Sequence, residues 1–281
     1  MDPGGPVSTD IQTFTLPLDR FDPDLLSSDA RTPGTPAFRQ AVNEALLATF
    51  QGFKGCASVT VDDRQVAVTW SPDSSAGETL LDIAISHLRR GRTAHGVQLL
   101  EFLLTRDPDD VNVLYNLGLA LSEARRLAEA EDHLTRAVEL TPDFINALVA
   151  LGVAQLRQQN NETAIETLER AVALDPAHPW ANRNLGIGHL KLGKHPDKAV
   201  EHLRKAVESQ PADQGAWLAL GDAQSQGGQR NSATDAYKRA IEINPHNELA
   251  EVARKASSQL AAHRPDGVSG VAETGDACSS V

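Results

Sequence analysis

Apolar residues recur along the middle of the chain in a pattern that repeats every 34 residues. In the unit formed by residues 111–144 they return every three or four positions over two short stretches, which predicts two amphipathic helices. The apolar positions of this unit are Leu114, Leu117, Leu121, Ala130, Leu134 and Ala137. The prolines that close successive units are Pro108, Pro142, Pro176, Pro211 and Pro245. A fixed period of this length predicts stacked repeats that bury their apolar faces against one another.

Small residues stand at matching places in the units. Glycine occurs on the first helix at Gly118, Gly152, Gly186 and Gly221. Glycine has no Cβ and is unfavourable inside a helix, so close packing by the second helix must compensate for it. We therefore expect the two helices of a unit to approach each other closely at these glycines.

These positions resemble the tetratricopeptide repeat, with its Leu-Gly pair, its alanines on the second helix and its closing proline. The resemblance covers residues 77–247 and implies a mostly α fold, a right-handed α-solenoid of about five helix-turn-helix repeats. By this pattern the repeats occupy residues 77–110, 111–144, 145–178, 179–213 and 214–247. The first copy departs from the pattern, because Ala84 replaces the usual glycine and Gly96 the usual alanine.

The segments at the two ends of the chain have different compositions. Residues 246–262 predict one amphipathic helix that caps the last repeat, with Leu249, Val252, Ala253 and Leu260 on its inner side. Residues 1–34 and 263–281 are polar and rich in Gly, Ser, Pro and Asp, so we expect disordered tails. The apolar run at residues 11–18 allows two interpretations: a segment that lies over the body, or a short docking peptide.

A small helix plus β-hairpin module is expected at residues 35–72, before the repeats. Apolar residues recur at helical spacing up to Phe53, and strict alternation follows. If the hairpin turns at residues 62–65, Val61 faces Val66 and Val59 faces Val68. We expect the module to cap the first repeat. The alternative is a dimerisation or recognition element with an open strand edge.

Composition narrows the possible partners and the location. The 281 residues carry a formal net charge of −12, without a basic cluster, which argues against nucleic-acid binding. No apolar run reaches the length of a membrane span, and the N-terminal residues lack the features of a secretory signal. There are two cysteines, Cys56 and Cys278, so no disulfide framework is indicated. We expect a cytoplasmic protein.

The sequence contains no recognisable catalytic or metal motif. The nine histidines are scattered, without the spacing of metal ligands on a helix. Neither a nucleophile elbow nor a glycine-rich phosphate loop after a strand is present. We therefore expect a non-enzymatic protein with no cofactor and no bound metal.

A surface for binding is implied by the resemblance, because in similar proteins the first helices line a concave groove that holds peptides. By repeat position, the candidate peptide- or protein-binding residues are Tyr115, Asn116, Leu119, Asn146, Val149, Val153, Trp180, Arg183, Asn184, Ile187 and Lys191. Several of them are apolar and are not needed to hold a repeat together, and an exposed apolar strip is typical of a binding site. The basic clamp of chaperone-binding members is incomplete here, since Asn146 and Ala150 stand where Lys and Arg belong. Asn116 and Asn184 match the asparagine ladder by which O-GlcNAc transferase grips peptide backbones.

The leading hypothesis is a scaffold or adaptor that binds a protein segment in this groove. One alternative is a self-assembling structural protein whose end module or tail docks into a neighbouring copy. Another is a regulatory accessory subunit of a separately encoded enzyme.

Overall fold

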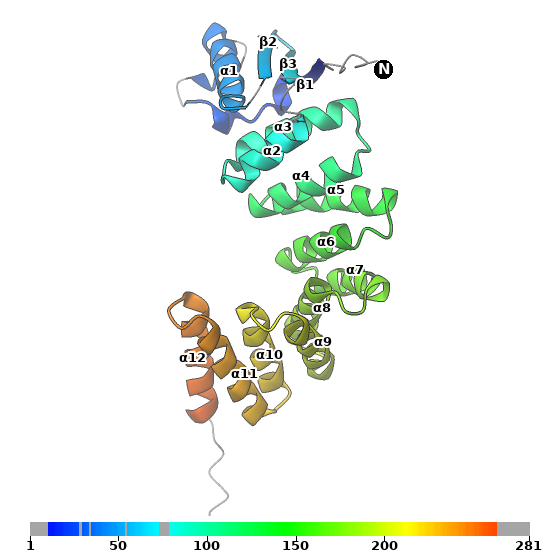
Figure 1. Cartoon of the computed structure of the whole chain (residues 1–281), viewed down its shortest axis with the longest axis vertical. Helices are drawn as coiled ribbons and strands as arrows, with labels where there is room; N and C mark the ends of the chain where they lie inside the picture. Colours follow the sequence, from blue (N-terminus) through cyan, green and yellow to red (C-terminus); the bar gives the residue numbers. More distant parts are fainter. Residues whose placement is uncertain (1–10, 28–29, 34, 54, 73–78, 263–281) are drawn as a thin grey trace, which may run out of the picture.

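The computed structural model describes residues 11–27, 30–33, 35–53, 55–72 and 79–262. It consists of a small N-terminal module followed by a curved stack of paired helices (Figure 1).

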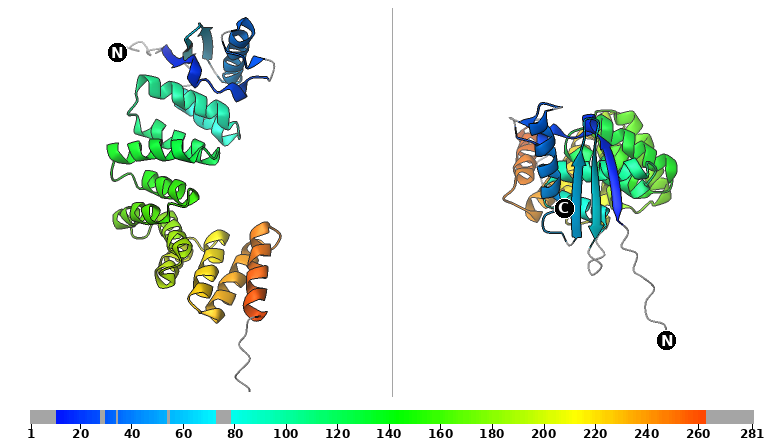
Figure 2. Two further views of the ribbon diagram at one scale, coloured as in Figure 1. Left: turned by 180° about the vertical axis from the view of Figure 1, so that it is seen from behind. Right: turned by 90° about the horizontal axis from the view of Figure 1, so that it is seen from above.

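The N-terminal module is a three-stranded antiparallel sheet with one helix. Its elements are β1 (Gln12–Pro17), α1 (Pro36–Thr49), β2 (Gly55–Val61) and β3 (Gln65–Pro72). The strand order is β1-β3-β2, and Val61 pairs with Val66 and Val59 with Val68, so the expected hairpin register is confirmed. Asn43 of α1 donates a hydrogen bond from Nδ2 to the carbonyl oxygen of Val59 (2.9 Å), which holds α1 beside β2 (Figure 2).

The expectation that residues 1–34 form a disordered tail is wrong for residues 12–26. Strand β1 pairs with the edge of β3 opposite β2, and two 3-10 helices follow, η1 (Leu18–Arg20) and η2 (Pro23–Leu25). The physical reason is burial: Phe14 and Leu16 of β1 are each only 1% exposed. Burying such large apolar side chains offsets the entropy lost when the segment is ordered. The apolar run therefore lies over the body of the protein. Residues 1–10 and 263–281 lie outside the described residues.

The rest of the described chain forms five helix pairs and one final helix. These are α2 (Leu80–Arg89) with α3 (Thr93–Arg106), α4 (Val111–Glu123) with α5 (Leu127–Leu140), α6 (Ile145–Arg157) with α7 (Asn161–Leu174), α8 (Pro179–Leu192) with α9 (Pro196–Ser209), α10 (Gln214–Gln226) with α11 (Arg230–Ile243), and α12 (Glu248–Ala262). The first helices of the pairs, α2, α4, α6, α8 and α10, contact one another in succession. The stack bends near α8 and α9, so that α10 to α12 run to one side of it (Figure 1). The helix pairs therefore form the expected α-solenoid.

The glycines of the first helices permit the close approach that the sequence predicted. A Cβ atom at Gly118 would lie 2.5 Å from Cγ of Leu134 in the paired helix, and one at Gly186 would lie 2.6 Å from Cγ of Leu203. In the first pair the arrangement is reversed: the glycine is Gly96 of α3, and it receives Leu88 of α2. The exchange of Ala84 and Gly96 in the sequence thus preserves close packing between α2 and α3.

The turn inside each helix pair holds one residue in the left-handed region. These residues are Gly91, Arg125, Gln159, Gly193 and Gly228, with φ between 66° and 74°. They are spaced by 34 residues except for the last step, which is 35. The extra residue follows Gly193, which ends α8, and therefore lies in the connection to α9. A turn accommodates an insertion at small cost in loop-closure entropy.

The N-terminal module covers the first helix pair. One continuous apolar cluster contains Phe14, Trp70, Ile83 and Phe102, so the sheet and the first pair share a core. His87 of α2, which is fully buried, donates a hydrogen bond from Nε2 to the carbonyl oxygen of Thr49 at the end of α1 (2.7 Å). Through these contacts the N-terminal module caps the solenoid at its first helix pair.

Helix α12 packs at the other end through Ala250 and Ala253, which are fully buried. Of the four residues expected on the inner side, Ala253 is buried and Leu260 packs against the same apolar cluster. The expectation is wrong for Leu249 and Val252, which are 38% and 46% exposed. Because the alanine side chains are small, α12 lies close to α11 and α10 on its alanine-bearing face. The larger apolar residues Leu249 and Val252 therefore point outward.

Candidate functional site

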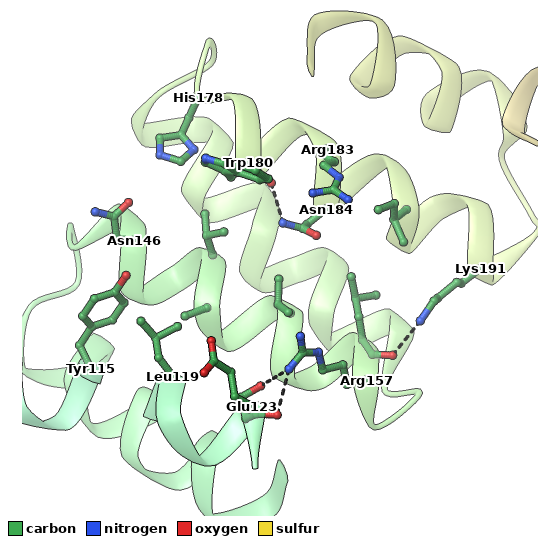
Figure 3. Close-up of a pocket in the computed structure, with 16 residues that line it drawn as sticks. Tyr115, Leu119, Glu123, Asn146, Arg157, His178, Trp180, Arg183, Asn184 and Lys191 are labelled. Atoms are coloured by element: carbon green, nitrogen blue, oxygen red, sulfur yellow. Dashed lines mark hydrogen bonds between the residues drawn. The ribbon is translucent and has the colours of Figure 1, made fainter. Parts of the chain in front are cut away.

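A cavity of about 500 Å³ lies on the inner face of α4, α6 and α8 (Figure 3). Ten of the eleven residues expected from the sequence line it, and Asn116 is the exception. Six further residues line it: Glu123 and Arg157, which also hold groove positions in the repeat pattern, and Ser122, Ala150, Leu156 and His178, which were not foreseen. The sequence held a signal for His178, because it directly precedes Pro179 at the start of a helix. His178 caps α8, its Nδ1 accepting a hydrogen bond from the backbone N–H of Ala181 (3.2 Å).

The floor of the cavity is apolar. Val149, Val153 and Ile187 are half-buried and lie on the cavity-facing side of α6 and α8. Tyr115 of α4 packs against Phe144, with ring centroids 5.0 Å apart, and burial raises the pKa of its phenol. The phenol therefore stays protonated and can donate or accept a hydrogen bond at the edge of this floor.

Trp180 and Arg183 form one wall. Trp180 is 44% exposed, and Cζ of Arg183 lies 5.4 Å from the centroid of its ring. Nε of Arg183 lies 3.4 Å from Oδ2 of Asp213, the residue that caps α10. A Cβ atom at Gly215 would lie 2.6 Å from Nη2 of Arg183, so the guanidinium is held against the start of the next repeat. Arg183 therefore joins two repeats as well as facing the cavity.

The two asparagines of the ladder pattern differ in position. Asn184 lines the cavity and donates one hydrogen bond from Nδ2 to the carbonyl oxygen of Trp180 (2.8 Å; Figure 3). An amide NH2 has two donors, so Asn184 keeps one N–H for other partners. Asn116 makes the equivalent bond to Asn112 (2.8 Å) but does not line the cavity. Of the two, Asn184 is therefore the one placed to contact a ligand there.

Two cations stand where the first helices end. Arg157 donates from Nη1 to both the carbonyl oxygen and Oγ of Ser122, each at 2.9 Å. Lys191 donates from Nζ to the carbonyl oxygen of Leu156 (3.0 Å). Each side chain thus reaches a carbonyl group at the C-terminal end of the preceding first helix, where the helix dipole places partial negative charge.

The described residues show no cluster typical of a metal centre and no helix typical of a membrane span. No group of three or more His, Cys, Asp or Glu side chains among them could hold a metal ion. His189 and His202 stack with ring centroids 6.0 Å apart, and burial lowers the pKa of both, so these histidines are neutral packing residues near neutral pH. None of the described helices combines the length and the apolar character needed to cross a bilayer.

Stacked helix pairs with an open cavity along their first helices define an α-solenoid repeat protein. Family models described as tetratricopeptide repeat match residues 81–143 and 183–248, and residues 121–181. Together these matches cover more than half of the chain. The chain belongs to the tetratricopeptide repeat family, whose members are generally protein-interaction scaffolds.

Solved structures agree with this assignment of the fold. MamA matches with a TM-score of 0.52 and 27% identity, over 58% of this chain and 95% of its own. A thermophilic TPR protein from Thermus thermophilus, TTC0263, matches with a TM-score of 0.53 and 23% identity, over 63% and 96%. YrrB, described as a TPR protein with an unusual peptide-binding site, matches with a TM-score of 0.52 and 20% identity, over 63% and 90%.

One curated protein is similar in sequence. Superkiller complex protein 3 of Mus musculus is 36% identical over 69 residues, which are 25% of this chain and 4% of that protein. This chain therefore matches only a small part of that relative.

Proposed function

We propose that this protein is a non-enzymatic scaffold or adaptor that binds a segment of another protein in the cavity lined by α4, α6 and α8. The observation that carries the proposal is the accessible apolar floor of Val149, Val153 and Ile187 within a hollow of about 500 Å³. Val149 and Ile187 pack against the apolar core of the repeats through part of their surface, and the rest of it faces the cavity. An accessible apolar surface beyond those contacts is typical of an interaction site.

The polar groups around the floor suit an extended peptide. The spare N–H and the Oδ1 of Asn184 can bond to backbone groups, whatever the ligand's side chains. Trp180 offers a large, rigid face, and aromatic residues dominate binding energies at interfaces. The apolar floor excludes water and so strengthens hydrogen bonds made beside it.

Self-assembly has one observation in its favour. Leu249 and Val252 expose apolar side chains on α12, the last helix of the described residues. A second copy that packed there would bury them. Light scattering on the full chain tests this candidate: a mass that stays monomeric at every concentration rules it out.

The groove is tested by partner capture with two variants that add the same charge. Val153→Asp places a carboxylate on the cavity floor, and Ala173→Asp places one on an exposed position of α7. Immobilised full-length wild type and Ala173→Asp should both capture the partner. Val153→Asp should bind the partner with an affinity at least about tenfold lower. Thermal melts of both variants check that the fold is kept. Equal capture by Val153→Asp would contradict the proposal.

A further inference from the structure

The cavity lining has a charge opposite to that of the whole chain. Its charged side chains are three cations, Arg157, Arg183 and Lys191, and one anion, Glu123. The whole chain, in contrast, has a net charge of −12. A local excess of positive charge in an acidic protein attracts anionic groups to that site.

Two of these cations have no carboxylate partner. Among the described residues, no Asp or Glu lies within salt-bridge distance of Arg157 or Lys191. The hydrogen bonds of Arg157 use Nη1, which leaves Nε and Nη2, and Lys191 uses one of three N–H groups. The forked donors of arginine match the two oxygens of a carboxylate. Arg183 differs, since Asp213 already neutralises part of its charge.

Arg157 and Lys191 each stand one helical turn beyond an apolar residue of the floor. Arg157 follows Val153 on α6 and Lys191 follows Ile187 on α8, both at a spacing of four residues, which places each pair on one helix face. The two members of such a pair are separated by about 5–6 Å along the helix axis. In an extended segment, residues two apart lie on the same face about 6–7 Å from each other. An aliphatic residue followed by an acidic one two positions later therefore fits this surface.

From the unpaired cations and their spacing from the apolar floor, we propose that the segment bound in this cavity carries Asp or Glu side chains alternating with aliphatic ones. The proposal rests on the proposed function of the same cavity and names the chemistry of its partner. The opposing explanation is that Arg157 and Lys191 serve only to cap the helices that end at Ser122 and Leu156.

Three labelled peptides with blocked ends separate these explanations. They share the same leucine and valine positions and carry, two residues after each aliphatic one, either Asp and Glu, or Asn and Gln, or Lys. Fluorescence anisotropy with the full chain should show the acidic peptide binding about tenfold tighter than the amide peptide, and the lysine peptide binding weakest. Added salt should reduce this preference, because it screens exposed charges.

Matched charge-removing variants then locate the effect. Arg157→Ser and Lys191→Ser should each lower the affinity for the acidic peptide by about five- to tenfold and leave the affinity for the amide peptide nearly unchanged. The control is Arg170→Ser, which removes a cation from an exposed position of α7 outside the cavity and should have no effect.

The outcomes distinguish the two proposals. If the amide or lysine peptide binds as tightly as the acidic one, and binding is still lost in Val153→Asp, the acidic ligand is wrong and the groove function stands. If Arg157→Ser and Lys191→Ser lower the melting temperature but leave the acidic preference intact, these residues are helix caps only. If no peptide binds in a manner that depends on Val153, both proposals fail.

Discussion

A Cβ atom built on Gly152 would lie 2.5 Å from Cγ of Leu168, a separation too short for two carbon atoms that are not bonded to each other. The contact sets the distance between α6 and α7. The same relationship recurs between Gly221 and the ring of Tyr237, also at 2.5 Å. The shape of the solenoid, and with it the cavity, depends on helix pairs packed this closely.

Gly152→Ala should destabilise the protein. The added methyl group must displace Leu168 or separate α6 from α7, and such overpacking costs about 1–3 kcal/mol. Gly227→Ala is a matched control, since a Cβ there would meet nothing closer than 3.5 Å. Chemical denaturation measures both variants. An unfolding midpoint in Gly152→Ala as high as in the control would show that this contact does not limit the packing.

Gln159→Gly should stabilise the protein. Gln159 has a φ of 67°, where a side chain is strained, and three of the other four turns have glycine at this position. Removing the strain stabilises the folded protein by about 1 kcal/mol. Glycine also increases the conformational entropy of the unfolded chain, which offsets part of this stabilisation. Gly193→Ala, at a φ of 70°, should change stability in the opposite direction. Thermal melts compare the two, and a lower melting temperature in Gln159→Gly would contradict the assignment of strain.

Glu101→Gln should have an effect that depends on pH. Burial raises the pKa of Glu101 from 4.5 to about 7 in the folded protein, and the side chain is only 23% exposed. Below pH 4.5 the carboxyl of Glu101 is protonated in both the folded and the unfolded protein, so its burial does not lower the free energy of unfolding. As pH rises towards 7, the unfolded chain ionises and the folded chain does not, so stability is lost. At about pH 8 the variant should exceed the wild type by about 1–3 kcal/mol in free energy of unfolding, and near about pH 4 the two should agree.

The control for this prediction is Glu129→Gln, because Arg126 lies near both carboxylates: its Nη2 is 3.9 Å from Oε1 of Glu101 and 2.6 Å from Oε2 of Glu129. The hydrogen bond from Arg126 lowers the pKa of Glu129, so its ionised form contributes stability at neutral pH and loses it on acidification. Its removal should lower stability at about pH 8. A Glu101→Gln variant less stable than the wild type at that pH would show that Glu101 is stabilised as an ion.

Leu16→Ala should destabilise the N-terminal module and leave the distant repeats intact. Leu16 is 1% exposed, and truncating a buried leucine costs about 2–5 kcal/mol. Since repeats contact only their neighbours, the loss should be confined to the sheet and the first helix pair. Hydrogen exchange should accelerate in β3 and α3 and stay unchanged in α10 and α11. Unchanged exchange in β3 would contradict the contribution assigned to β1.

The parts of the structure that the sequence predicted are those set by local pattern. The helix pairs follow from apolar spacing within 34 residues, and the hairpin register follows from alternation across a short turn. Strand β1 was missed because its partner is remote: Gln12 pairs with Trp70. The contact between Arg183 and Asp213 escaped prediction for the same reason, since it crosses between repeats. The inward face of α12 was predicted only in part, for Ala253 and Leu260, because alanine and larger apolar residues occur on adjacent positions.

The central claim, that a protein segment lies on the inner face of α6 and α8, is tested most directly by site-specific photo-crosslinking. The photoreactive residue p-benzoylphenylalanine replaces Ile187 on the cavity floor in one protein and Ala173 on the exposed side of α7 in another. After irradiation with the captured partner, the covalent adduct should form from position 187 and not from position 173. An adduct from position 173 alone would contradict the account.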